Sequence, residues 1–293
     1  MKIEIWPAHG PLNSKDVFAK FIKSLRSSGE QVYENKAIPN GDVAVIWSVL
    51  WQGRMRNYKD IWDRYRKANK PVIVIEVGGI KRNETWKIGI NGVNREADFG
   101  NQIVDDQRWK KFNIELKPWK QTGNDIIICG QHHNSHQWRE NPGLKSYFKN
   151  CIEEIRRYTD KPIVIRPHPR NIVHNFPEHK YKHVRVNLPK RDWNTYDDTD
   201  FKKILASTWA VVNHSSNPAM EAVIHGIPVF VSEKSLCHDV GNTDLSDILH
   251  PAMPARQNWA NQLSYTEWFT EEFREGKPWA RIRERLLEKY IKK

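Results

Sequence analysis

Two apolar patterns alternate along the first part of the chain and predict an α/β fold. Residues 2–8, 42–49 and 71–78 form short apolar runs typical of strands, and the last is almost continuously apolar. A parallel strand covered on both faces has this pattern. Residues 14–30 and 57–70 instead place apolar side chains at helical spacing. The order strand-helix-strand-helix-strand predicts a doubly wound parallel sheet.

The same alternation restarts after an irregular segment. Residues 81–120 are rich in Asn, Gly and charge, and we expect loops or a short hairpin there, followed by a linker. Further strands and helices are expected at 125–131, 143–159, 161–168, 200–208, 209–215, 217–226 and 227–233, and helix throughout 263–293. We therefore predict two Rossmann-like, doubly wound domains facing a cleft, at residues 1–120 and 121–250. The C-terminal helices, residues 251–293, are expected to pack back across both.

The composition is that of a water-soluble globular protein. Of 293 residues, 39% are hydrophobic and 28% charged, and no apolar run approaches the roughly 20 residues of a membrane helix. The N-terminus lacks the apolar centre of a signal peptide. Cys129, Cys151 and Cys237 lack the spacing of a disulfide framework or zinc site. We expect a cytoplasmic protein that does not associate with membranes, of unknown oligomeric state.

The charge balance points to an anionic partner. The net charge is +12, with 22 Lys or Arg against 14 Asp or Glu in residues 1–120, and 25 against 21 in residues 121–293. A basic excess in one domain suits nucleic acid, although it is also typical of an ordinary solvated surface. The 13 tryptophans include both core residues and potential stacking platforms for bases or sugars.

Polar and basic residues follow three strands of the second domain where each strand ends. Ligands of open parallel sheets bind beyond these carboxyl ends. Ser215 and Ser216 also precede a helix, whose N-terminus favours phosphate. Gly130 would let the backbone approach a ligand, Trp138 would offer a flat face, and Glu221 would accept ribose hydroxyls. The full candidate set is Gly130, Gln131, Ser135, Gln137, Trp138, Arg166, His168, Pro169, Arg170, His214, Ser215, Ser216, Asn217 and Glu221.

Each signal also has a structural interpretation. Ser215 or Ser216 could be an ordinary N-cap, and His168 between two prolines could be a packed turn residue. A metal site is disfavoured because the histidine spacings match no common zinc pattern and no acidic ligand accompanies them. Those histidines are His132, His133, His136 and His168. The coincidence of three strand ends favours ligand binding.

The order strand, "RPHPR" (166–170), strand, paired serines and helix resembles the nucleotide-binding domain of GT-B glycosyltransferases. Within that fold it is similar to bacterial sialyltransferases, Kdo transferases and capsule or teichoic-acid transferases, over about residues 121–235. The resemblance implies that His168 and Pro169 contact the nucleotide of a sugar donor, a UDP-sugar first, and that Ser215 and Ser216 hold its phosphate. It also implies that no metal or other cofactor is required. The acidic run 196–200 opens a helix and is interpreted as capping.

Nearly the whole chain also resembles a group of phage-encoded glycosyltransferases. The resemblance lies in "SVLWQGRM" (48–55), "VIVIEVGG" (72–79), "GINGVN" (89–94), "GQHHNSHQW" (130–138) and "RPHPR". Phage DNA glycosyltransferases of this architecture attach sugars to 5-hydroxymethylated pyrimidines and reach the hydroxyl by turning the base out of the stack. The resemblance implies a DNA-modifying enzyme of the host cytoplasm.

The first domain supplies candidates for the base and for acceptor binding. An inverting transfer needs a base for the acceptor hydroxyl, and Glu76, Asp98 and His9 are candidates in that order. Glu76 could equally be a salt-bridged strand-end carboxylate. Residues 51–70 interleave aromatics with seven Lys or Arg, which suits phosphate contacts but also the outer face of an ordinary amphipathic helix. The acceptor or DNA candidates are Trp51, Arg54, Arg56, Arg64, Trp86, Lys87, Asn91 and Asn94.

The sequence therefore predicts a glycosyltransferase that moves a sugar from a nucleotide sugar to a hydroxymethylated pyrimidine, such as 5-hydroxymethylcytosine, in phage DNA. Two alternatives stay open. One is a capsule-type or Kdo-type polysaccharide glycosyltransferase. The other is a nucleic-acid-binding module whose nucleotide pocket has no transferase activity.

Overall fold

The chain divides into two compact units in the computed structural model, which describes all residues except 101–102, 121, 191–199 and 292–293. Unit 1 comprises Met1–Asn113 and Ala260–Lys293, and unit 2 comprises Ile114–Trp259. The boundaries expected after residues 120 and 250 both fall inside unit 2. How the terminal helices lie across the two units stays a prediction.

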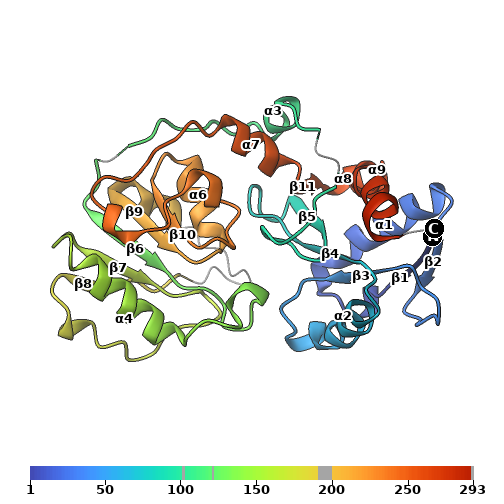
Figure 1. The fold of residues 1–293 in the computed structure, drawn as a ribbon, viewed down its shortest axis with the longest axis horizontal. Coiled ribbons are helices and arrows are strands. Elements are labelled where there is room, and N and C mark those ends of the chain that lie inside the picture. The colour runs from blue at the N-terminus through green and yellow to red at the C-terminus, as the bar shows by residue number, and fades with distance from the viewer. Residues whose placement is uncertain (101–102, 121, 191–199, 292–293) are drawn as a thin grey trace. The chain divides into compact units, whose positions relative to one another are not determined.

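Unit 1 is built around a six-stranded sheet of order β11-β5-β4-β3-β1-β2 (Figure 1). Strands β1 to β4 pair in parallel, whereas β5 runs antiparallel to both β4 and β11. The segment expected to be loop or a short hairpin contributes β5, and the segment expected to be entirely helical contains β11. The strands are β1 (Lys2–Ile5), β2 (Gln31–Glu34), β3 (Val43–Trp47), β4 (Val72–Val77), β5 (Thr85–Ile90) and β11 (Glu267–Phe269).

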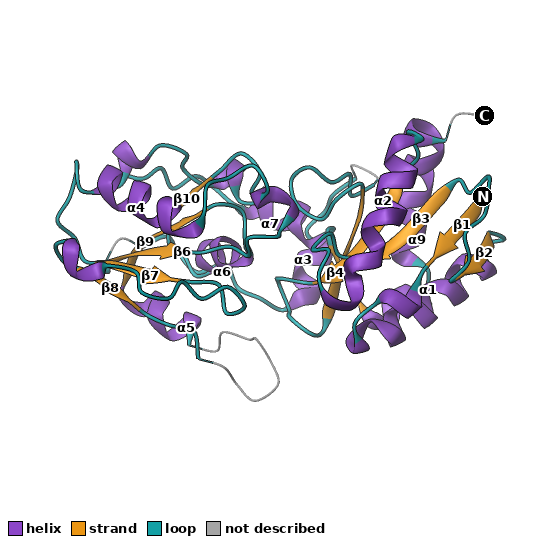
Figure 2. Ribbon diagram, turned by 90° about the horizontal axis from the view of Figure 1, so that it is seen from below, coloured by secondary structure: helices purple, strands orange, loops and turns teal. Residues whose placement is uncertain are grey.

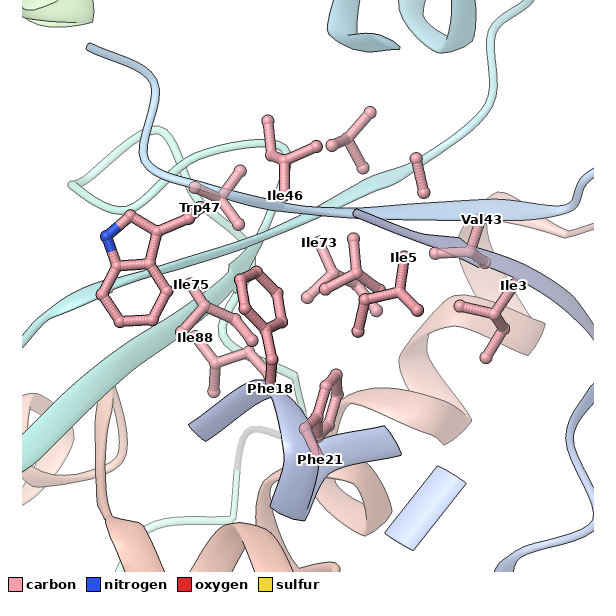
Figure 3. Packing of buried hydrophobic residues seen from close by; sticks show 14 of the residues in the cluster. Ile3, Ile5, Phe18, Phe21, Val43, Ile46, Trp47, Ile73, Ile75 and Ile88 are labelled. Carbon is pink, nitrogen blue, oxygen red and sulfur yellow. The ribbon is translucent and has the colours of Figure 1, made fainter. Parts of the chain in front are cut away.

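Helices cover both faces of this sheet. The helices are α1 (Lys15–Ser27), α2 (Tyr58–Lys67), α3 (Gln107–Phe112), α8 (Thr270–Arg274) and α9 (Lys277–Arg285), while α7 (Gln257–Ser264) spans the unit boundary. In α1, Phe18 and Phe21 point toward strand residues such as Ile75 and Ile88, whereas Ile46 of β3 points to the other side (Figure 3). Helix α2 packs against β3 and β4. The alternation along the strands thus buries apolar side chains on both faces.

Unit 2 has a five-stranded sheet of order β10-β9-β6-β7-β8, and all of its strands are parallel (Figure 2). The strands are β6 (Asp125–Cys129), β7 (Ile163–Arg166), β8 (Val184–Val186), β9 (Thr208–Asn213) and β10 (Val229–Val231). The helices are α4 (Leu144–Ile155), α5 (Phe201–Ile204) and α6 (Asn217–Ile224). The expected second parallel-sheet unit is therefore confirmed.

The central strand of unit 2 is buried on both sides. Ile126 and Ile128 belong to the apolar cluster formed with α4, and Ile127 between them is also fully buried. This is why β6 is a continuous apolar run instead of an alternating one. Helix α6 packs against β9 and β10. Among the helices that the structure describes, none has the length and apolarity needed to cross a membrane.

Candidate functional site

Three neighbouring strands of unit 2 end at one edge of the sheet, and each is followed by polar groups. Strand β6 lies between β9 and β7, and the three are parallel, so their carboxyl ends are adjacent. Gln131 follows β6, His168 follows β7, and Ser215 and Ser216 follow β9. The structure thus brings together the side chains that sequence analysis selected from three separate segments. Ligands of parallel sheets bind at this edge.

Gln131 holds two of these segments together. Its side chain is 3% exposed, and its Oε1 accepts hydrogen bonds from the backbone N and the Oγ of Ser215, both at 3.1 Å. Its Nε2 donates to Ser135 Oγ at 2.8 Å. Gln131 and Ser135 therefore fix the loop after β6 against the start of α6, and Ser215 is held in place before any ligand arrives.

The segment between β9 and α6 is shaped by Asn213. Its Oδ1 accepts from the Ser216 backbone N at 2.8 Å, and its Nδ2 donates to Ser216 Oγ at 2.7 Å. Ser216 is the N-cap residue in extended conformation, but its side chain does not cap the helix. Asn217 and Pro218 open the helix and are half-buried. The positive end of the α6 dipole therefore lies at the carboxyl-end edge of the unit 2 sheet, where an anion is favoured.

A histidine pair and His168 lie at the ends of β6 and β7. His132 stacks on His133 with ring centroids 4.9 Å apart and meets His168 edge-on at 5.3 Å. Burial lowers the pKa of His132 to about 4, and the charges of His133 and Arg170 add to this, so His132 is neutral at pH 7. Within the described residues, no group of three or more His, Cys, Asp or Glu is placed to hold a metal.

The backbone selects the tautomers of these two rings. Asn134 N donates to His132 Nδ1 at 3.1 Å, and Arg170 N donates to His168 Nδ1 at 3.1 Å. Because Nδ1 accepts in each ring, the proton of the neutral form lies on Nε2. Half-buried His168 can then donate a hydrogen bond from Nε2 to a ligand oxygen. Pro169 is half-buried and Arg170 exposed beside it.

Several other candidates in unit 2 support the site from within the protein. Trp138 is 3% exposed, and its ring meets Tyr147 at 5.0 Å and His214 at 5.2 Å, so its face is used in the core. His214 Nε2 lies 3.0 Å from the Gln137 carbonyl oxygen, and burial lowers the pKa of His214. Trp138, expected to offer its face to a ligand, instead packs the loop after β6 against β9.

Gly130 and Arg166 are also packed against protein. A Cβ on Gly130 would lie 3.0 Å from the Phe148 ring and 3.2 Å from His168 N, so glycine permits the close approach of the β6 and β7 ends. Arg166 is 3% exposed, and its guanidinium donates to Asn187 Oδ1. Both residues are buried, and they support the packing of the strand ends from inside the protein.

Glu221 lies one turn into α6. Its carboxylate is 3.8 Å from Lys202 Nζ, and its side chain is 28% exposed. The carboxylate therefore remains accessible to solvent, as binding of ribose hydroxyls requires. Of the acidic run 196–200, only Asp200 lies within the described residues; it is the N-cap residue of α5 and makes no side-chain cap bond. Capping by residues 196–199 concerns positions outside the described residues.

The base candidates of unit 1 differ in their surroundings. Glu76 is half-buried near the end of β4. Burial raises the pKa of Glu76, while the Lys87 and Arg82 charges and the Ser48 hydroxyl oppose this increase. His9 is half-buried after β1, where its ring stacks on Trp6 at 5.4 Å. Glu76 combines partial exposure with a raised pKa, which suits a general base.

Asp98 is held in an ion-pair network. Its Oδ2 accepts from Arg285 Nε at 2.8 Å, Lys289 Nζ at 3.3 Å and the Tyr290 hydroxyl at 3.2 Å. Burial tends to raise its pKa, but these hydrogen bonds hold the pKa of Asp98 below its ordinary value. A carboxylate so engaged is a weak proton acceptor, and its position anchors the C-terminal helices to the loop after β5.

The basic segment of unit 1 contains both exposed and structural arginines. Arg54 and Arg56 are exposed on a 3-10 turn, Gly53–Asn57. Arg64 instead binds the fully buried Glu4 with both terminal nitrogens, at 2.9 and 2.6 Å. Trp51 is half-buried against Trp62, 5.8 Å between ring centroids. Arg64 is therefore committed to the fold, which departs from its expected role in DNA binding.

The acceptor candidates after residue 85 are mostly internal. Trp86 is 5% exposed and donates from Nε1 to Thr270 Oγ1 at 2.8 Å. Asn91 has φ +61° and accepts from Val72 N at 3.0 Å, which closes the end of β5. Asn94 is half-buried in the next loop, where its backbone N lies 3.3 Å from Glu96 Oε1. Asn91 and Asn94 follow β5 in the loop, as expected, whereas Trp86 lies within the strand.

Lys87 was also expected to approach the acceptor, but it is a buried cation. It is 4% exposed and lies between Glu76 of β4 and Glu267 of β11 in the strand register. Glu267 was not selected from the sequence, because its segment predicts a helix and its strand is only three residues long. Asn213 was missed as well, since it is the last residue of an apolar strand.

Known structures place these two units in one fold class. No protein-family model and no curated protein matches the chain. Among solved structures, it is similar to Thermosulfurimonas dismutans KpsC, a beta Kdo 2,4 transferase, with TM-score 0.60, 11% identity and 92% of each chain covered. The beta Kdo 2,7 transferase of the same KpsC gives TM-score 0.55 and 13% identity over 93% of this chain and 97% of that one.

The chain has the GT-B fold. This confirms the fold class predicted from the sequence, with its two Rossmann-like units. At these identities the likeness extends to the fold alone. The activity has to be argued from the residues themselves.

Proposed function

We propose that this GT-B protein is a glycosyltransferase, and that unit 2 binds the nucleotide of an activated sugar at the carboxyl ends of β6, β7 and β9. The observation that carries this proposal is a set of contacts at the strand ends: Gln131 holds Ser215 at the start of α6, and His132 of the same loop meets His168 edge-on. A site built in advance costs little to organise when a ligand binds. The fold is also shared with two Kdo transferases.

The reaction we propose requires stabilisation of a leaving phosphate. As the acceptor oxygen bonds to the anomeric carbon, the bond from that carbon to the nucleotide phosphate breaks, and negative charge develops on the phosphate. The α6 dipole, Ser216 at the start of α6 and the Nε2 proton of His168 would stabilise that charge. The acceptor proton would pass to Glu76, whose pKa is raised by burial. The proposed transfer uses no metal, and chelation with EDTA tests that point.

We assign the acceptor as a hydroxymethylated pyrimidine in DNA. The net charge of +12, its concentration in residues 1–120 and the exposed Arg54 and Arg56 support an anionic polymer. The half-buried aromatic pair Trp51 and Trp62 lies in the same segment, with the Arg66 guanidinium 6.0 Å from the Trp62 ring. Aromatic and cationic groups together suit contacts with bases and phosphates.

A glycan acceptor is the second candidate, because the similar solved structures act as Kdo transferases by name. It predicts a sugar or lipid-linked saccharide hydroxyl in place of the base. Both candidates share the donor site in unit 2 and the base in unit 1. They differ only in what approaches Glu76.

The deciding experiment offers both acceptors at once. The full chain is incubated with duplexes containing 5-hydroxymethylcytosine, with matched cytosine duplexes, and with Kdo-containing oligosaccharides. UDP-, GDP- and CMP-sugars are supplied separately, with and without EDTA. Nucleosides and oligosaccharides are then analysed by mass spectrometry.

We expect one donor, with UDP-sugars first, to add a sugar mass to hydroxymethylcytosine and none to cytosine. Transfer to the oligosaccharide alone would replace the DNA acceptor by the second candidate. Nucleotide binding without transfer to either acceptor would overturn the transferase and leave a binding module. Loss of transfer in EDTA would overturn metal independence while preserving the rest.

A further inference from the structure

Three charged side chains stand in one row across the end of the unit 1 sheet. Glu76 of β4 pairs with Lys87 of β5, and Lys87 pairs in turn with Glu267 of β11. Residues directly opposite each other on neighbouring antiparallel strands have Cβ atoms about 5 Å apart and lie on the same face. Lys87 is 4% exposed and Glu267 is fully buried. A buried cation thus lies between two carboxylates.

Glu267 has its own hydrogen-bond donors. Oε1 accepts from Gly79 N at 2.6 Å, and Oε2 accepts from Ile80 N at 3.0 Å and from Thr85 Oγ1 at 2.9 Å. A Cβ on Gly78 would lie 2.4 Å from Glu267 Oε2, so only glycine lets the carboxylate sit under the turn. These donors satisfy the charge of Glu267 and fix the turn that joins β4 to β5.

The charge of Glu76 is influenced mainly by side chains. The groups that act on its charge are Lys87 on β5, the Ser48 hydroxyl after β3, Arg82 in the turn and Glu96 beyond β5. Arg82 and Glu96 are exposed, so water screens their effects. Helix α2, which packs against β3 and β4, contributes the buried side chains Tyr58, Ile61 and Tyr65, and burial raises the pKa of both tyrosines.

We propose that Lys87 is a positioning residue for Glu76, and that its ammonium group keeps the half-buried carboxylate ionised and ready to accept the acceptor proton. A base that loses its hydration by burial is a stronger proton acceptor, but it is useful only while it is deprotonated. Burial alone would favour the protonated form of Glu76. The opposite charge of Lys87 nearby favours the ionised carboxylate. Glu267 holds the turn and thereby the β4–β5 register that sets Lys87 opposite Glu76. This inference rests on the proposed role of Glu76.

The first test is the pH profile of transfer. In Lys87→Met the acid limb of kcat/KM should move to higher pH by about one unit or more, because Glu76 loses the cation opposite it in the strand register. The variant should therefore lose most activity at low pH and recover toward the wild-type rate at high pH. Lys87→Arg should restore the wild-type limb, and Arg82→Met, which removes an exposed charge, should move it much less. An equal loss at every pH in Lys87→Met would overturn the inference.

The second test does not depend on activity. In protein labelled with ¹³C at the glutamate carboxyl carbon, the Glu76 resonance is assigned by its loss in Glu76→Gln. Its titration midpoint should lie at higher pH in Lys87→Met than in the wild type. An unchanged midpoint in a folded variant would overturn the role of Lys87. If the midpoint moves but no acceptor is glycosylated by the wild type, the proposed function fails and the coupling of Lys87 to Glu76 stands.

A double-mutant cycle covers the case in which Lys87→Met unfolds. If Lys87 neutralises Glu76, removing both charges should restore part of the lost thermal stability. Glu76→Gln/Lys87→Met should then melt at a higher temperature than Lys87→Met alone. A double variant no more stable than the single one would show that Lys87 serves the sheet independently of Glu76.

Discussion

The residues selected from the sequence are placed differently at the carboxyl edge of the unit 2 sheet and on the basic surface expected on unit 1. At the unit 2 edge, residues from three segments meet: Gln131 binds Ser215, and His132 meets His168 edge-on. In unit 1, Arg64 and Trp86 were chosen for DNA or acceptor contact but are used by the fold. Residues at the ends of parallel strands must lie at one edge of the sheet, so their positions follow from the topology. For charged and aromatic residues on a helix or loop, only tertiary packing decides which side chains face solvent.

The largest expected effect concerns the base in unit 1. Glu76→Gln keeps the shape of the side chain and removes the proton acceptor, so turnover should fall about 10²- to 10⁴-fold. Donor and DNA affinities should stay nearly intact. Single-turnover transfer with both substrates saturating measures this. Glu84→Gln, an exposed carboxylate in the β4–β5 turn, is the control and should keep the wild-type rate. A Glu76→Gln rate within about threefold of wild type would move the base to His9.

Arg64 tests whether the basic helix is partly structural. Arg64→Met leaves the fully buried Glu4 without its bidentate partner, and we expect a loss of about 2 kcal/mol in the free energy of unfolding. The estimate is modest because the Arg64 side chain is 42% exposed. Urea unfolding measures the loss. Arg66→Met, at an exposed position of the same helix, should change stability by less than about 0.5 kcal/mol.

The Arg64–Glu4 ion pair also predicts how the free energy of unfolding depends on pH. Burial acts to raise the pKa of Glu4, but hydrogen bonds from Arg64 and from Ile38 N hold it below its ordinary value of 4.5. A carboxyl with a lowered folded-state pKa adds stability above its unfolded pKa and loses it as the pH falls. The stability difference between wild type and Arg64→Met should therefore be full at pH 7 and shrink below about pH 4.5. A constant difference down to pH 3 would contradict the pairing.

The donor site provides the next effect in size. His168→Ala with Ser215→Ala should weaken nucleotide binding at least tenfold, about 1.4 kcal/mol, because a donor to the phosphate and the hydroxyl bound by Gln131 are both lost. The fold should survive, since Ser215 N still donates to Gln131. Calorimetry with UDP measures the affinity. Ser146→Ala, on the exposed side of α4, is the control. Unchanged affinity in the double variant would remove the nucleotide from this edge.

The smallest effect concerns the exposed arginines. In the double variant Arg54→Glu/Arg56→Glu, the slope of log DNA affinity against log salt concentration should become shallower by about two. Each phosphate contact contributes about 0.9 to that slope. Donor affinity should not change. Lys145→Glu with Lys180→Glu changes the net charge equally at exposed positions of unit 2 and should leave the slope near wild type. The same slope in both double variants would mean that total charge, and not this surface, attracts DNA.

The sequence by itself determined most of the fold. The periodicities predicted the parallel strands and main helices of both units, because period 2 and period 3.6 are local properties of a chain. It also selected His168, Ser215 and Ser216, which the structure places after β7 and β9 at the same edge of the sheet, on either side of β6. Their role in binding a nucleotide stays a prediction.

Only the tertiary structure decided which charged and aromatic side chains are available to a ligand. Nothing local separates Arg64, which binds buried Glu4 sixty residues away in sequence, from Arg56, which is exposed. Strand β11 was missed because three residues carry too little periodicity, and its pairing with β5 joins the two ends of unit 1. The row of Glu76, Lys87 and Glu267 exists only through that pairing. Burial and long-range pairing are properties of the assembled sheet, so no window of the sequence contains them.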